Sequence, residues 1–65
     1  MSQYAIYDKE GNPLETFEAK CDSDVALFAI KYAMRCGLDE WSLHRTGANY
    51  TKLRLVMDVN DRTVC

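Results

Sequence analysis

Residues 23–36 are the one stretch of this chain that has both the length and the apolar spacing of an amphipathic helix. Asp22 or Ser23 can cap its first turn, since each has a short side-chain oxygen that accepts a backbone N–H. Gly37 follows the stretch at the position where a left-handed residue commonly ends a helix. The sequence therefore predicts a helix over residues 23–36 with a cap at each end.

Small side chains dominate one face of this predicted helix. At about 100° per residue, Ala26, Ala29 and Ala33 lie together, opposite a narrow polar stripe. Such a face allows a helix backbone to approach a sheet closely. Leu27 and Phe28 border the polar stripe instead. Either a loop or a chain end covers this pair, or the pair forms a self-association or partner contact, as exposed apolar patches often do.

The remaining sequence has the alternation and the turn residues of two β-hairpins. Four segments alternate as half-buried strands do: residues 3–8, 14–19, 41–45 and 50–59. The first turn contains Gly11 and Pro13, which are typical turn residues. The sequence predicts an α+β fold of order β-β-α-β-β, a four-stranded antiparallel sheet with one helix packed on one face. We expect one domain over residues 1–65.

The last strand shows the clearest alternation, and it sets the expectation for both sheet faces. Leu53, Leu55, Met57 and Val59 are expected to face the core. The opposite face of the sheet is expected to stay open. Its expected residues are Tyr7, Thr16, Glu18, His44, Tyr50, Lys52, Arg54 and Val56.

Catalytic chemistry has little support in this sequence. His44 is the single histidine, and no nucleophile-elbow, zinc-protease or phosphate-loop motif is present. Cys21, Cys36 and Cys65 could join His44 as four zinc ligands, but their irregular gaps match no paired zinc pattern. We therefore expect no enzyme, cofactor or metal, and reduced thiols with Cys21 and Cys36 partly buried.

No membrane segment or secretory signal is visible. No run approaches the roughly 18 uncharged apolar residues of a membrane span, since Lys31 interrupts the most apolar stretch. The first residues lack the basic and apolar regions of a signal peptide. The expected location is the cytoplasm.

Charge is divided unevenly along the chain. Residues 1–24 carry six acidic residues against two lysines, a balance of −4, whereas residues 25–54 have a balance of +3. An acidic edge of this kind either keeps a protein soluble or steers a basic partner surface toward it. The expected protein-binding residues are Asp8, Glu10, Glu15, Glu18, Asp22 and Asp24.

Two other functions fit the sequence. Aromatic and basic side chains interleave on the expected open face, which is the chemistry that binds single-stranded nucleic acid. The net charge of −2, the pI near 5.1 and the missing Lys/Arg-Gly-Phe box disfavour direct nucleic-acid binding. The third function is an orphan structural or assembly domain that forms a homodimer through Leu27 and Phe28.

In size and charge, and in its lack of catalytic residues, the chain resembles the small phage-encoded inhibitors. Among them are the anti-CRISPR proteins, several of which mimic DNA. The resemblance extends over the whole chain but includes no motif, so it implies no particular site residue. It implies a partner with a basic, nucleic-acid-handling surface, such as a CRISPR effector component, in the cytoplasm of a host cell.

Overall fold

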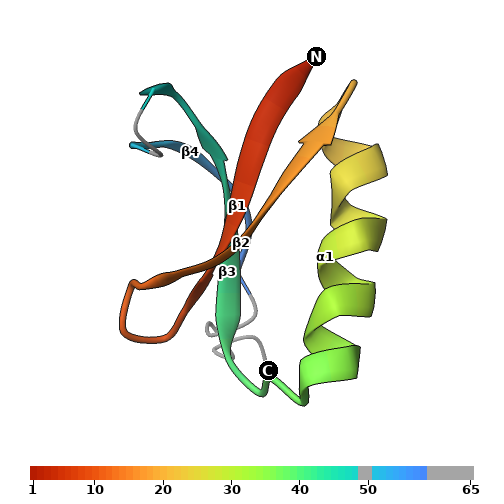
Figure 1. The fold of residues 1–65 in the computed structure, drawn as a ribbon, viewed down its shortest axis with the longest axis vertical. Helices are drawn as coiled ribbons and strands as arrows, with labels where there is room; N and C mark the ends of the chain where they lie inside the picture. Colours follow the sequence, from red (N-terminus) through yellow and green to blue (C-terminus); the bar gives the residue numbers. More distant parts are fainter. Residues whose placement is uncertain (49–50, 59–65) are drawn as a thin grey trace, which may run out of the picture.

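A four-stranded antiparallel sheet with one helix on one face makes up the fold (Figure 1). The computed structural model describes residues 1–48 and 51–58, so the expectations for Tyr50, Val59 and Cys65 lie outside the described residues. The elements are β1 (Ser2–Asp8), β2 (Pro13–Ala19), α1 (Asp22–Cys36), β3 (Trp41–Thr46) and β4 (Lys52–Asp58). The strand order is β2-β1-β3-β4. The predicted fold class is therefore confirmed.

The helix ends as the sequence predicts but begins differently. Gly37 has φ 69° and lies in the left-handed region, and the N–H of Leu38 donates to the C=O of Ala33 at 2.9 Å. At the other end, Cys21 is the capping residue and makes no side-chain cap bond. The prediction of a cap at Asp22 or Ser23 is wrong, because the helix already includes both residues.

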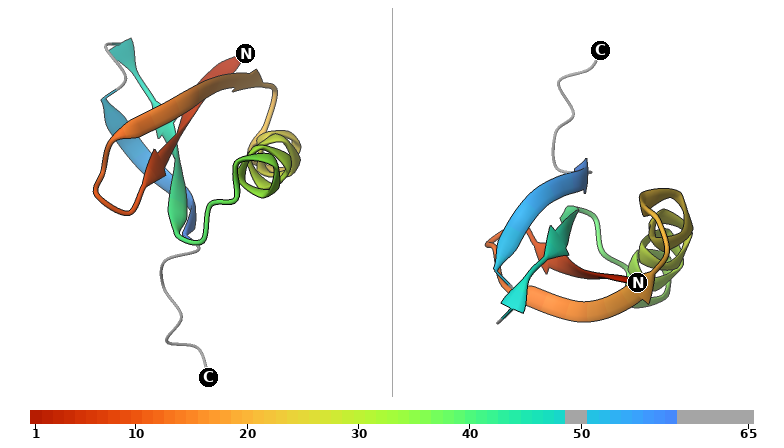
Figure 2. Two further views of the ribbon diagram at one scale, coloured as in Figure 1. Left: turned by 60° about the horizontal axis from the view of Figure 1, so that its bottom comes forward. Right: turned by 90° about the horizontal axis from the view of Figure 1, so that it is seen from above.

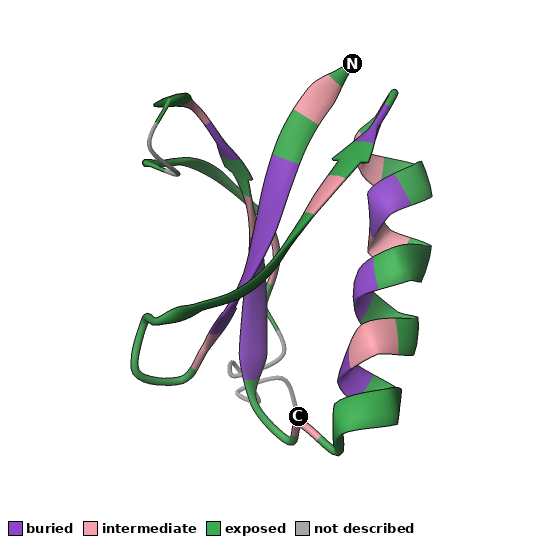
Figure 3. Ribbon diagram, in the orientation of Figure 1, coloured by how far each residue is buried: buried purple, intermediate pink, exposed green. Residues whose placement is uncertain are grey.

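Helix α1 contacts the sheet through its smallest side chains. Val25 and Ala29 are 0% exposed and Ala33 is 4% exposed, and they pack in one core with Ile6 and Leu43 of the central strands. In Figure 3 the buried stripe of α1 faces the sheet, and the exposed surface of the helix faces away. Because the stripe is narrow, the larger side chains of the helix are left at its flanks and on its outward face.

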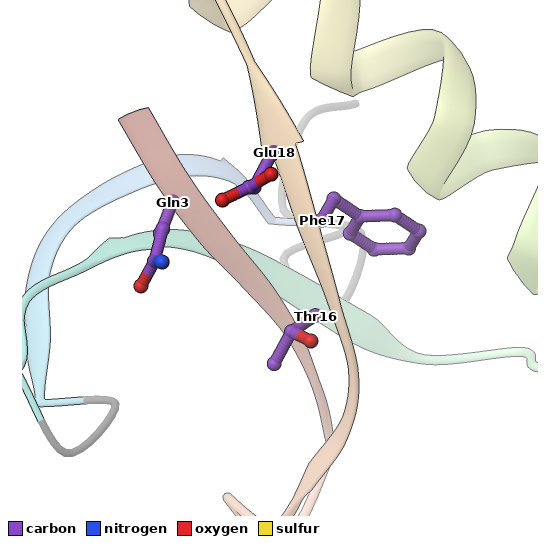
Figure 4. Close-up of a pocket in the computed structure, with 4 residues that line it drawn as sticks. All are labelled: Gln3, Thr16, Phe17 and Glu18. Carbon is purple, nitrogen blue, oxygen red and sulfur yellow. The ribbon is translucent and has the colours of Figure 1, made fainter. Parts of the chain in front are cut away.

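The first hairpin follows its predicted alternation. Tyr4 pairs with Phe17 across the two strands, and both side chains lie on the helix side of the sheet. The ring of Phe17 meets that of Tyr32 edge-on, with centroids 6.1 Å apart. Figure 4 shows Phe17 pointing toward α1, whereas Thr16 and Glu18 project from the other side of β2. Edge strand β2 thus carries aromatic packing on one side and polar groups on the other.

Strand β4 departs from its predicted alternation because its pairing with β3 is irregular in two places. His44 pairs with Leu55 directly after Leu43 pairs with Met57, so one residue of β4 is left out of the register. A second irregularity lies between Arg54, which pairs with Arg45, and Lys52, which pairs with Thr46. Each extra residue reverses the side-chain alternation that follows it.

Only some of the β4 residues that were expected to face the core do so. Leu53 is 61% exposed and Leu55 is 51% exposed, so the prediction that they face the core is wrong. Val56, expected on the open face, packs against the core instead, together with Met57. The sheet also curls strongly, and its helix-free side is partly folded on itself (Figure 2).

The close approach of α1 predicts sensitivity to size at Ala29. Ala29→Leu adds volume at a fully buried position, so we expect a loss of about 1–3 kcal/mol in the free energy of unfolding. Ala26→Leu, at a half-buried flank of the same helix, should cost less. Urea denaturation of both variants checks this, and equal stability of Ala29→Leu and the unmodified protein would contradict the packing.

Candidate protein-interaction surfaces

Four carboxylates surround a hollow at one end of the sheet, where the first hairpin turns beside the connection between α1 and β3. The pairing of Asp8 with Trp41 brings these two segments together, although they are about thirty residues apart in the sequence. The hollow has a volume of about 350 Å³ and its wall includes one cation, Lys9. We call its carboxylates the acidic end; they belong to Asp8, Glu10, Asp39 and Glu40.

Asp8 is held in place by the turn that follows it. Its Oδ1 accepts the backbone N–H groups of Glu10 and Asn12, each at 2.9 Å. These bonds stabilise the ionised carboxylate, with that of Asn12 the strongest, so the pKa of Asp8 lies below its ordinary value of 3.8. Asp8 therefore supplies a fixed negative charge at the acidic end.

The other three carboxylates at the acidic end are exposed to solvent. Glu10, Asp39 and Glu40 are exposed, and none of them forms an ion pair with a described residue. Asp39 and Glu40 were not expected at this site from the sequence, because they lie in the half of the chain that is basic on balance. The pairing of β1 with β3 was the information needed to find them.

The other expected protein-binding residues do not gather at this end. Glu15 lies on the helix side of β2, in register with Ile6, and Glu18 lies on the opposite side, in register with Gln3. Asp24 is exposed in the first turn of α1. Asp22 has a role inside the fold. The six residues expected to form one edge are thus distributed over the hairpin turn, both sides of β2 and the helix start.

Asp22 ties three elements together. The hydroxyl of Tyr4 on β1 donates to Asp22 Oδ1 at 2.7 Å, and Arg54 on β4 donates to Asp22 Oδ2 and forms an ion pair with it. The hydrogen bond to Asp22 is the largest cause that raises the pKa of Tyr4 above 10.0, and burial adds to it. Asp22 therefore links the helix start to both a central and an edge strand.

The Tyr4–Asp22 bond predicts a loss of stability at alkaline pH. The pKa of Tyr4 is raised on folding. Its contribution to the free energy of unfolding is therefore complete below pH 10 and is lost as the pH rises through the folded-state pKa. Tyr4→Phe should cost about 1–2 kcal/mol at neutral pH and should reduce this alkaline loss. Urea denaturation between pH 7 and about pH 11 measures both effects.

Asp22→Asn is the matched control, because it keeps an acceptor beside Tyr4 but removes the charge. It should also weaken the alkaline loss of stability. Identical alkaline profiles for the unmodified protein and Tyr4→Phe would show that this bond does not contribute.

Leu27 and Phe28 form an exposed apolar surface on α1. Leu27 is 61% exposed and Phe28 is 50% exposed, and no described loop covers them. Both line a hollow of about 440 Å³, together with Met1 and Lys31. The outward surface of α1 is exposed along most of its length in Figure 3. Of the two alternatives that the sequence leaves open, cover by a loop is not seen among the described residues, and a role in association is a separate matter.

The helix-free side of the sheet forms the expected open face only in part, because Thr16, Glu18 and Lys52 are exposed but Tyr7 and His44 are not. Tyr7 is only 3% exposed, with the Nζ of Lys52 4.3 Å from its ring centroid and His44 edge-on to it at 5.2 Å. Arg54 lies on the helix side, where it meets Asp22. Among the described residues, this side therefore has no row of exposed aromatic rings on which bases could stack.

His44 is half-buried in this cluster. Its Nε2 lies 3.2 Å from the Oγ of Ser42. Burial, followed by the nearby charge of Lys52, lowers the pKa of His44 below 6.5. The neutral imidazole is thus the form that the fold favours.

The lowered pKa of His44 predicts a loss of stability in mild acid. The contribution of His44 to the free energy of unfolding is complete above pH 6.5. It falls as the pH drops toward the folded-state pKa, because the unfolded chain binds the proton more readily. We expect His44→Gln to flatten the change in melting temperature between about pH 7 and pH 5. A change that is as steep in His44→Gln as in the unmodified protein would contradict this role.

Neither thiol that the structure describes is buried. Cys21 and Cys36 are both free and exposed, so the expected partial burial is wrong. Among the described residues, no three His, Cys, Asp or Glu side chains are placed to hold a metal ion together. The described part of the chain also has no helix that is long and apolar enough to cross a membrane.

Comparison with known proteins adds no relative. A scan against models of protein families found no match, and searches of curated proteins and of solved structures found no similar protein. The function of the chain is therefore inferred from the geometry of these surfaces.

Proposed function

We propose that this chain is a small, non-catalytic interaction protein whose acidic end contacts a basic surface of a partner protein. The observation that carries the proposal is the hollow at the acidic end, where four carboxylates and a single lysine come from two distant segments. Three of these carboxylates are exposed and have no ionic partner among the described residues. A cationic surface is the chemistry that complements them.

The physical advantage of this arrangement is in the rate of association. Charges of one sign that converge on a hollow raise the local concentration of an oppositely charged partner and accelerate its approach. Asp8 is held in place by its turn, so part of the field is oriented before the partner arrives. Because the other carboxylates are exposed, bringing a cation to them removes little water from buried groups.

Inhibition of a nucleic-acid-handling protein in the cytoplasm is the specific form of this proposal. A basic groove that binds phosphates also attracts carboxylates, and a chain of this size and charge resembles small phage-encoded inhibitors, including anti-CRISPR proteins. The burial of Tyr7 and the net charge of −2 favour a protein partner over direct binding of nucleic acid.

The test reverses charge at the acidic end and follows partner capture. Immobilised protein is exposed to bacterial lysate at about 0.1 M and about 0.5 M salt, since exposed charges are screened over roughly 10 Å at the lower value and less at the higher. We expect Glu10→Lys with Glu40→Lys to abolish the salt-sensitive capture. With the captured partner purified, association should slow by about tenfold or more.

Glu15→Lys with Glu18→Lys is the matched control, with the same change of charge on β2; association is measured at about 1 μM or below, because Glu18 also lines the hollow beside Leu27 and Phe28. It should slow association less than the acidic-end reversal does. Capture that is unaffected by salt and by the acidic-end reversal would contradict the proposal. Direct retardation of labelled single-stranded DNA or RNA in a gel, lost in Lys52→Glu, would favour the nucleic-acid alternative.

A further inference from the structure

The exposed surface of α1 carries a short pattern that complements itself. Asp24, Leu27, Phe28 and Lys31 follow the spacing i, i+3, i+4 and i+7, which places them on one side of a helix. All four are exposed, and all four line the same hollow, whose wall also includes one acid and one base from the end of β2 and the residue after it, Glu18 and Lys20. Two apolar residues thus lie between an acid toward the start of the helix and a base toward its end.

When a second copy of α1 packs antiparallel against the first, groups of unlike kind meet. When two antiparallel helices cross between Leu27 and Phe28, each Leu27 meets the Phe28 of the other copy. Each Asp24 then meets the Lys31 of the other copy, because both pairs are centred on the same point of the sequence. A two-fold contact requires this reciprocity, in which residue i meets j and j meets i.

We infer that this surface is a homodimer contact, in which two copies of α1 pack antiparallel through Leu27 and Phe28 with Asp24–Lys31 pairs on either side. An apolar centre with charged groups at its margin is the usual composition of a protein–protein interface. A parallel arrangement would instead place Asp24 against Asp24 and Lys31 against Lys31. Charge complementarity therefore determines both the occupant, a second copy, and its direction.

The dimer goes beyond the proposed function and uses a different surface. The acidic end lies at the hairpin turn and the α1–β3 connection, whereas this contact is centred on the middle of α1. A dimer would present two acidic ends, since each copy retains its own. The two proposals are therefore tested by different variants, and a negative result for one does not decide the other.

The size of the contact sets the expected affinity. Two helices that meet over about two turns bury less surface than a standard interface, which places the dimer among weak complexes. We expect a Kd on the order of 10–100 μM, so protein should shift from monomer to dimer over an accessible range of concentration. Sedimentation equilibrium on the full chain, between about 5 μM and about 1 mM, measures this directly.

Two single charge reversals test the arrangement. Asp24→Lys places lysine against lysine across the contact, and Lys31→Asp places aspartate against aspartate. Each variant alone should remain monomeric where the unmodified protein dimerises. Lys9→Asp, which makes the same charge change as Lys31→Asp at an exposed position on the first hairpin, should dimerise as the unmodified protein does. Circular dichroism of each variant establishes that the helix is retained.

Mixing the two single variants provides the rescue. Across an antiparallel contact, position 24 of one copy meets position 31 of the other. The Asp24→Lys variant has lysine at both positions and the Lys31→Asp variant has aspartate at both, so the mixture should form a heterodimer although neither component self-associates. The double variant Asp24→Lys with Lys31→Asp should also dimerise. This rescue cannot be explained by damage to the fold, because the same substitutions are present in the mixture.

Four results would overturn the inference. The first is an unmodified protein that remains monomeric up to about 1 mM. The second is single reversals that dimerise as well as the unmodified protein, which would indicate a parallel contact or a different surface. The third is a mixture that stays monomeric beside a dimeric unmodified protein. Binding of another protein to this surface, without self-association, would also contradict it.

Discussion

The contact between the smallest side chains of α1 and the centre of the sheet determines where every larger side chain of the helix lies. Ala29 and Ala33 fill the space between the helix and the strands, and Val25 completes the same stripe. With this narrow stripe inward, Leu27 and Phe28 are placed outside the core. The stripe that packs the core thus also creates the apolar surface that we assign to self-association.

Two acidic side chains, at the start of α1 and in the first hairpin turn, also stabilise the fold. Asp22 would be a solvent-exposed cap if the helix began one residue later, but in the fold it binds Tyr4 and Arg54 and links α1 to two strands. Asp8 is likewise committed to its turn, although it keeps its charge. Counting acidic residues along a sequence therefore overstates the charge that is available to a partner, because some carboxylates serve the fold.

The fold class and the local elements of this fold could be predicted from the sequence, but the strand order and the register of β4 could not. The end of the helix at Gly37 and the first hairpin depend on turn chemistry and alternation, which are local properties. The two irregularities of β4 depend on pairing with β3, so alternation alone placed Leu53 and Leu55 in the core incorrectly. The position of Asp39 at the acidic end could not be predicted either, because only the β1–β3 pairing brings it there.

The orientation of α1 can be measured by isotope-filtered NOE spectroscopy on a mixture of ¹³C-labelled and unlabelled protein. We expect intermolecular contacts between the Leu27 methyl groups and the Phe28 ring. We expect no contact within one chain between that ring and the methyl groups of Leu43, which is 0% exposed in the core. Strong contacts between Phe28 and Leu43 of the same chain, without any intermolecular signal, would contradict this orientation.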